Sequence, residues 1–216
     1  WLATTADLIF PVLLAAAAAR EIIAGRNWRN LVVLFPVTIL GIANLLMHLE
    51  ANGADVPPGL GWRLGLAAII VLISIIGGRI VPSFTRNWLA KRPGAALPAS
   101  QGRLDLAALI TLPVALAGWV FLPDTPAIGA LLLLGAALHL ARLARWRGLS
   151  TTAEPLLLVL HIGYAWVVFG VALLGLSVLG AAITPSAAIH ALTAGAIGTM
   201  TLAVMTRVSL GHTGRR

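Results

Sequence analysis

Seven apolar runs, separated by short polar connections, are the feature of this chain that most constrains its fold. They lie at about 2–19, 31–49, 64–81, 104–122, 127–143, 155–179 and 187–207. Each is close to the ~20 residues that a helix needs to cross ~30 Å of hydrocarbon. Hydrophobic residues make up 59% of the chain and charged residues 10%, and the mean hydropathy is +0.96. So few charges cannot cover a soluble domain, so we predict an all-α, polytopic transmembrane helix bundle with about seven spans, surrounded by a lipid bilayer.

The ends and the missing residue types narrow the possibilities further. The chain starts at Trp1 inside an apolar run, so we expect residues 1–216 to form a single transmembrane domain that is a fragment of a longer chain. The absence of cysteine excludes disulfides, Cys-ligated zinc and iron–sulfur clusters. The sequence also lacks a P-loop, GxSxG, HExxH or a GxGxxG followed by a helix, and nucleotide-driven or hydrolytic chemistry therefore has no support.

The basic residues report topology, because they gather in alternate connections. Fourteen of the 15 Lys and Arg residues fall on one side of the predicted bundle, and Arg63 alone falls on the other. The positive-inside rule then predicts a periplasmic N-terminus and a cytoplasmic C-terminus in a bacterial inner membrane, and argues against nucleic-acid binding. Tryptophans are expected as interfacial anchors, with Asp7 and Asp105 also at the interfaces. The cytoplasmic anchors are Trp28, Trp88 and Trp146, and the outer ones are Trp1, Trp62 and Trp119.

Proline positions predict where helices end and where they bend. Most prolines fall at or near span ends, where a missing backbone N–H matters least: Pro57, Pro58, Pro82, Pro123, Pro126, Pro155 and Pro185. Pro11, Pro36 and Pro113 lie within spans, and we expect local kinks whose freed carbonyls neighbouring helices satisfy.

The five histidines are the candidate metal ligands, because an unpaired imidazole in hydrocarbon costs several kcal/mol. The predicted spans place them at two depths. His48 and His190 lie toward the outer face, whereas His139, His161 and His212 lie toward the cytoplasmic face. Imidazoles from different helices at one depth suit a haem iron, or copper with a third ligand. The alternative is that a histidine at a helix end meets headgroups or water; we favour that alternative for His139, and it stays open for His212.

Other residues support these candidates without deciding between roles. Asn44 lies four residues before His48, and Tyr164 three residues after His161, so each shares a helix face with a candidate ligand. Arg79 and Arg207 end spans, where a guanidinium anchors either haem propionates or lipid headgroups. Three methionines are soft donors for Cu(I), although packing is the commoner role of this residue: Met47, Met200 and Met205.

Four strings of residues together resemble the NnrS family of bacterial membrane proteins. They are Asn44-Leu-Leu-Met-His48, Gly77-Gly-Arg-Ile-Val-Pro-Ser-Phe-Thr-Arg-Asn87, His161-Ile-Gly-Tyr-Ala-Trp166 and the segment from His190 to Arg215. The last string, which ends in Met-Thr-Arg-Val-Ser-Leu-Gly-His-Thr-Gly-Arg, is the most specific. The resemblance covers essentially the whole chain and implies a middle-to-late portion of a family member.

The resemblance implies an inner-membrane protein that contains haem and copper and acts in nitric oxide metabolism and nitrosative-stress resistance. It implies nitric oxide or iron–nitrosyl species as ligands, with redox activity on them as one option and an electron donor that the sequence does not identify. By analogy, the ligand candidates are His48, His161, His190 and His212, supported by Asn44, Arg79, Tyr164 and Arg207.

Two alternatives from other classes remain open at this point. Histidine and arginine inside a membrane bundle also suit a transporter or channel with a His/Arg-lined path, and broken helices at Pro36 and Pro113 would serve it. A metal-free signalling or assembly factor is the third option. The optical spectrum of the purified protein separates a haem protein from both.

Overall fold

The computed structural model describes the backbone of residues 2–213 and the side chains of residues 4–28 and 30–210. Within those residues the chain is helical and contains no strand, which confirms the all-α prediction. The elements are α1 (Leu2–Ala24), η1 (Trp28–Asn30), α2 (Leu31–Ala51), α3 (Leu60–Leu89), α4 (Arg103–Phe121), α5 (Pro126–Ala144), η2 (Gly148–Thr151), α6 (Pro155–Val178), α7 (Pro185–His190), η3 (Ala191–Gly198) and α8 (Thr199–Thr213).

Six helical segments in the described part of the chain are long and apolar enough to cross a bilayer. They are Leu31–Ala51, Leu60–Leu89, Arg103–Phe121, Pro126–Ala144, Pro155–Val178 and Pro185–Leu210. The first predicted span is also a helix, α1, but it is not among these six. The prediction of about seven spans is therefore close to the observed number.

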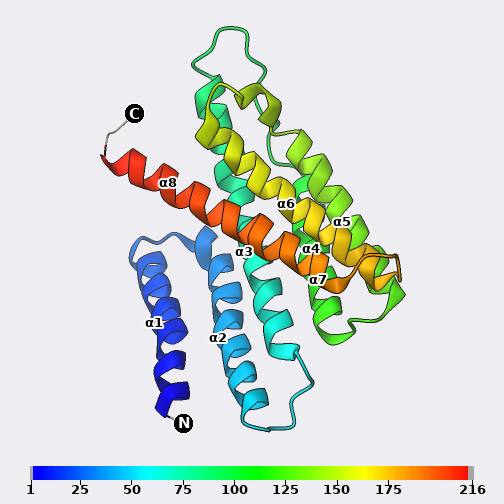
Figure 1. Ribbon diagram of the computed structural model, residues 1–216. Helices are drawn as coiled ribbons and strands as arrows, with labels where there is room; N and C mark the ends of the chain where they lie inside the picture. Colours follow the sequence, from blue (N-terminus) through cyan, green and yellow to red (C-terminus); the bar gives the residue numbers. More distant parts are fainter. Residues whose placement is uncertain (1, 214–216) are drawn as a thin grey trace. The chain divides into compact units, whose positions relative to one another are not determined.

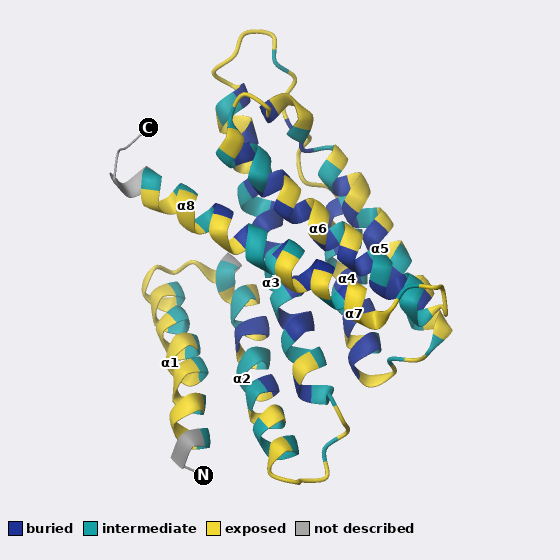
Figure 2. Ribbon diagram, viewed as in Figure 1, coloured by how far each residue is buried: buried dark blue, intermediate teal, exposed yellow. Residues whose placement is uncertain are grey.

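The chain divides into two compact units, Trp1–Leu72 and Ile73–Arg216. In the first unit α1 packs against α2, with the ring of Pro11 facing Gly41. No described residue of α1 is buried (Figure 2). The connection from α2 to α3 is fixed by a hydrogen bond of 2.9 Å from the backbone N–H of Gly59 to the Glu50 carboxylate.

The second unit contains the larger core. The consecutive helices α4, α5 and α6 are neighbours, and α7, η3 and α8 continue one another along α6 (Figure 1). The core at one end of this unit consists of Val81, Trp146, Leu157, Leu160, Tyr164, Met200 and Ala203. Trp146 and Trp119 are only 3% and 4% exposed. The prediction that these two tryptophans are interfacial anchors is therefore wrong, because their rings pack among helices.

Prolines begin three helices of the second unit, as their missing N–H predicts. Pro126, Pro155 and Pro185 are the first residues of α5, α6 and α7. Pro82 behaves differently, because α3 does not end near it but continues to Leu89. A proline inside a helix leaves the carbonyl four residues earlier without its helical donor, and here that carbonyl belongs to Gly78.

Candidate functional site

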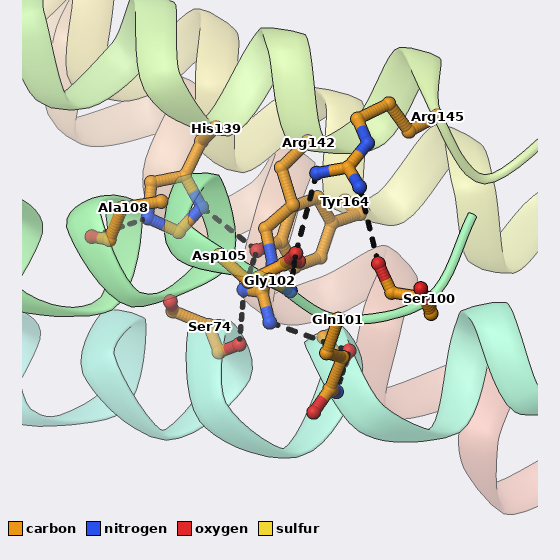
Figure 3. A network of polar contacts seen from close by, with 11 residues as sticks. Ser74, Ser100, Gln101, Gly102, Asp105, Ala108, His139, Arg142, Arg145 and Tyr164 are labelled. Atoms are coloured by element: carbon orange, nitrogen blue, oxygen red, sulfur yellow. Dashed lines mark hydrogen bonds and ion pairs between the residues drawn. The ribbon is translucent and has the colours of Figure 1, made fainter.

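A buried cluster of polar residues, here called the Arg142 network, joins four helices of the second unit. It consists of Ser74 and Gly78 on α3, Gly102, Asp105 and Ala108 at or in α4, His139, Arg142 and Arg145 on or after α5, and Tyr164 on α6 (Figure 3). Asp105 lies in the first turn of α4 and Arg142 in the last turn of α5, whereas Ser74 and Gly78 lie in the middle of α3.

The Arg142 guanidinium is the centre of the network and is 1% exposed. Its Nε donates to Asp105 Oδ1 at 2.9 Å. Its Nη1 donates to the Ser74 carbonyl at 3.2 Å and to the Tyr164 hydroxyl at 3.0 Å. Its Nη2 donates to the Gly78 carbonyl at 3.3 Å. A cation this deeply buried is tolerated only when its N–H groups are paired and a counter-ion is present, and this geometry supplies both.

Asp105 is that counter-ion and also caps a helix. Its Oδ2 accepts the backbone N–H of Gly102 at 2.9 Å, which satisfies a donor at the N-terminus of α4. The same oxygen lies 3.4 Å from Nη1 of Arg145. The residue is 6% exposed, so the prediction that Asp105 lies at the interface is wrong. The positive end of the α4 dipole and two arginines stabilise this carboxylate in the bundle.

Gly78 and Pro82 explain why a guanidinium fits against α3. Because Pro82 has no N–H, the Gly78 carbonyl needs an outside donor, and Arg142 Nη2 provides it. Gln101 Nε2 lies 3.5 Å from the same oxygen. A Cβ on Gly78 would overlap both terminal nitrogens of Arg142, so only glycine leaves room for the guanidinium at this position. The Gly77-Gly78 pair of the family string therefore has a packing role.

Tyr164 connects the guanidinium to His139. The Tyr164 oxygen lies 2.8 Å from His139 Nδ1, and His139 Nε2 lies 3.1 Å from the Ala108 carbonyl. A carbonyl only accepts, so Nε2 carries a hydrogen and Nδ1 accepts the tyrosine proton. His139 is 1% exposed, and the expectation that it meets headgroups or water is wrong. Both of its nitrogens are committed, so it has no lone pair for a metal.

Removing the Tyr164 hydroxyl tests this chain of hydrogen bonds. Tyr164→Phe keeps the ring, which packs 4.5 Å from that of Trp146, but leaves His139 Nδ1 and one N–H of Arg142 without a partner. We expect the free energy of unfolding to fall by about 1–3 kcal/mol, because buried polar groups lose their hydrogen bonds. Denaturant unfolding in detergent, followed by circular dichroism, measures the change. An unchanged unfolding curve would contradict the role given to this hydroxyl.

His161 lies on the same helix face as Tyr164 but points into a different environment. Its Nδ1 donates to the Leu157 carbonyl at 2.9 Å, and its Nε2 lies 3.3 Å from Thr85 Oγ1. The Thr85 hydroxyl also lies 2.8 Å from the Val81 carbonyl, so its single hydrogen serves either that oxygen or the imidazole. Thr85 occupies the position next to Nε2, and a metal at that nitrogen requires the threonine side chain to turn away.

His190 has the opposite surroundings, because its side chain is exposed although it lies inside an apolar span. Its Nδ1 lies 2.8 Å from the Ser186 carbonyl one turn earlier. This bond places the ring hydrogen on Nδ1 and leaves the Nε2 lone pair directed away from the helix backbone. The π-helical segment η3 starts at the next residue, and such segments are frequent at functional sites.

His48 and Asn44 lie in the first unit and share one partner there. His48 Nε2 and Asn44 Nδ2 each lie 2.8 Å from Asp7 Oδ2. A carboxylate that holds one imidazole nitrogen orients the ring and raises the basicity of the other nitrogen, as in metal sites. Sequence reasoning placed Asp7 only at the interface and missed this pairing. The sequence feature that indicates this pairing is depth. Asp7 lies near the start of the first predicted span and His48 near the end of the second, on the same side of the predicted bundle.

The remaining predicted residues are placed as follows. The backbone of His212 belongs to the last turn of α8, and its side chain lies outside the described residues. Arg207 forms an ion pair of 3.6 Å with Glu154, and its guanidinium carbon lies 4.7 Å from the centre of the Phe84 ring. Arg79 is half-buried on α3, one residue after Gly78.

The structure does not bring His161 and His190 together. Gly170 on α6 lies against Leu192, so in these antiparallel segments His190 is level with about residue 172 of α6. That is about 11 residues from His161, or about 16 Å along the helix. Among the described residues no group of three His, Asp or Glu side chains could hold a metal ion. His161 and His190 therefore do not share one site in this structure.

Comparison with known protein families supports the resemblance found in the sequence. The sequence profile of the family described as "NnrS protein" matches residues 1–216, the whole chain. The chain belongs to the NnrS family. Neither a comparison with curated proteins nor one with solved structures gave a match. This NnrS chain is thus a helical membrane protein, and the resemblance seen in its sequence is confirmed.

The donor chemistry of this NnrS chain fits a haem iron better than a closed copper site. A haem needs one or two axial nitrogens, and His190 offers an imidazole whose Nδ1 is already held by a carbonyl. A three-ligand copper site needs side chains that converge, and the described residues bring no group of three His, Asp or Glu side chains together. A copper ion would therefore need ligands in addition to the described side chains.

Proposed function

We propose that this protein acts in nitric oxide metabolism and nitrosative-stress resistance as a haem- and copper-containing membrane protein. The observation that carries the proposal is His190, an exposed imidazole in an apolar span whose Nδ1 is held and whose Nε2 is directed outward. An imidazole prepared in this way suits an axial ligand, and it is costly in hydrocarbon without a partner.

The chain contributes ligation, orientation and exclusion of water. A haem iron or copper ion would supply a redox centre with affinity for nitric oxide or iron–nitrosyl species. In the second unit His190 would provide Nε2, and the Ser186 carbonyl holds its Nδ1. In the first unit His48 would provide Nδ1, because Asp7 holds its other nitrogen. The surrounding hydrocarbon of the membrane would keep water away from an imidazole in a spanning helix.

The distribution of charge supports an inner-membrane location with a cytoplasmic C-terminus. The ends of α3 and α5 and the starts of α4 and α6 carry the basic residues, whereas the opposite connections of this unit carry none. This is the distribution that the positive-inside rule associates with the cytoplasmic face. Arg79 and Arg207 stay predicted anchors for haem propionates or lipid headgroups, and Arg207 is paired with Glu154 at 3.6 Å.

The alternative function, a transporter with a His/Arg-lined path, gains less support. Its strongest feature is the buried pair of Arg142 and Asp105, since intramembrane charges often mark substrate paths. These side chains, however, bond to each other and to backbone carbonyls of the packed helices. Neither described cavity is lined by either residue. The pair is therefore better explained as a contact that holds the packed helices together.

The test replaces His190 with Ala in the purified protein. We expect the wild-type protein to show a haem Soret band and bound copper, and His190→Ala to lose one of them, because the axial imidazole is gone. Absorption spectroscopy and elemental analysis measure the two contents.

Ser186→Ala is the matched control, since it removes a hydroxyl one turn away and keeps the carbonyl that holds the ring. It should retain both cofactors. Unchanged haem and copper in His190→Ala would refute His190 as a ligand. A colourless, metal-free wild-type protein would refute the haem and copper assignment itself.

A further inference from the structure

A cleft of about 470 Å³ lies between α5 and α6 at the end of the second unit that carries the basic residues. Its walls are mainly apolar side chains of the two helices, and η2 lies at its mouth. Leu140 and Leu143 on α5 and Leu158 and Ile162 on α6 line it, with Arg147 and Ser150 where the helices end. The cleft is thus apolar along its length and polar where the helices end.

The cleft belongs to the surface that faces lipid. Leu140 and Ile162 on its two walls are 57% and 44% exposed, and Leu149 on its rim is 90% exposed. From Leu158 to Ala165 the α6 wall extends about 10 Å along the helix. A groove of this kind, open to hydrocarbon and about two turns deep, accommodates the beginning of an acyl chain.

Arg147 gives the mouth of the cleft its charge. Arg142 and Arg145, which precede it, are paired with Asp105. Within the part of the chain that the structure describes, the Arg147 side chain forms no hydrogen bond or ion pair. Its backbone is left-handed, with φ of 60°, a conformation that disfavours residues other than glycine. The chain nevertheless places arginine here and glycine at the next position.

The position of η2 beside the cleft depends on Gly148. A Cβ at this position would lie 2.7 Å from Cδ2 of His161, so the missing side chain lets η2 lie directly on the imidazole. His161 therefore turns a carbon edge toward Gly148, while its nitrogens engage Leu157 and Thr85. The polar groups left at the mouth are the Arg147 guanidinium and the Ser150 hydroxyl.

We infer that this cleft binds an anionic phospholipid, with the phosphate on Arg147 and Ser150 and an acyl chain between α5 and α6. No carboxylate lines the cleft to receive the ammonium of a zwitterionic lipid, and nearby Glu154 is paired with Arg207. A free phosphate is less suited to it, because a single cation is present and the walls are apolar. Basic residues at a membrane surface select anionic lipids in this way.

Native mass spectrometry of the purified protein tests the inference by titration with phosphatidylglycerol, phosphatidylcholine and inorganic phosphate. Wild-type protein should bind phosphatidylglycerol in preference to phosphatidylcholine. Arg147→Gln should bind phosphatidylglycerol about fivefold more weakly, because this is the affinity that one arginine contributes near an anionic surface. Arg147→Lys keeps the charge and should retain most of the affinity. Ala144→Phe, which fills the groove without changing charge, should also weaken binding.

Arg103→Gln is the matched control, because Arg103 is an exposed arginine at the same end of the unit but does not line the cleft. It should bind as the wild type does. Equal phosphatidylglycerol affinity in wild type and Arg147→Gln overturns the inference. So does an equal loss in Arg103→Gln, which indicates net charge alone, or competition by millimolar phosphate, which indicates a site for the free anion.

Discussion

Replacing Arg142 with Leu should lower the free energy of unfolding by about 3–5 kcal/mol, because it leaves a buried carboxylate without its main partner. Of its two arginine partners, Asp105 would keep only Arg145, at the longer distance of 3.4 Å. The carbonyls of Ser74 and Gly78 and the Tyr164 hydroxyl would also lose a donor. Denaturant unfolding in detergent measures the loss. A change below 1 kcal/mol would show that the Arg142 network does not hold the helices together.

A second variant separates the loss of charge balance from the loss of packing. Arg142→Leu combined with Asp105→Asn removes both charges while the amide oxygen still caps α4 through the Gly102 N–H. The double variant should be more stable than Arg142→Leu alone, because a neutral pair carries no uncompensated charge. Arg103→Leu, at an exposed position, should change stability by no more than about 0.5 kcal/mol.

Replacing Gly78 with Ala should cost about 2–3 kcal/mol, although alanine favours helices. The new methyl group would overlap both terminal nitrogens of Arg142, and the guanidinium would have to leave the Gly78 carbonyl. The same unfolding measurement reports the cost. Stability equal to or above that of the wild type would mean that the guanidinium is not seated against α3.

Two controls make the Gly78 result specific to Arg142. Gly135→Ala adds a methyl group at an ordinary contact distance of 3.7 Å from Leu112, and should be neutral or stabilising by up to about 1 kcal/mol. In the Arg142→Leu background, Gly78→Ala should have little further effect, since the two residues act through one contact. A full additional loss there would point to a clash with something other than the guanidinium.

The helices could be predicted from the sequence because each one depends on a single continuous run of residues. Apolar runs of nearly twenty residues need a helix in lipid, whatever packs against them. The end of α3 could not be predicted in the same way. Pro82 is a sound stop signal when only its own helix is considered, but α3 passes it because Arg142, 60 residues later in the sequence, supplies the missing donor.

The buried network was missed for a related reason. Arg142, Asp105 and His139 all lie near predicted span ends, where charged groups ordinarily meet water or headgroups. Their pairing depends on which faces of four helices meet, and a single sequence does not contain that information. The spacing of Asn44 and His48 did place both on one face, and the structure shows them on a common carboxylate oxygen. The metal-ligand roles of His48, His161, His190 and His212 stay predictions.

The carbonyl of Gly78 has a mechanical consequence for α3. In an uninterrupted helix the turn before residue 82 is closed by the helix itself, but here a side chain of α5 closes it. The local backbone geometry of α3 at this turn therefore depends on a side chain of α5, and a change at Arg142 removes a hydrogen bond from α3 without altering the sequence of α3.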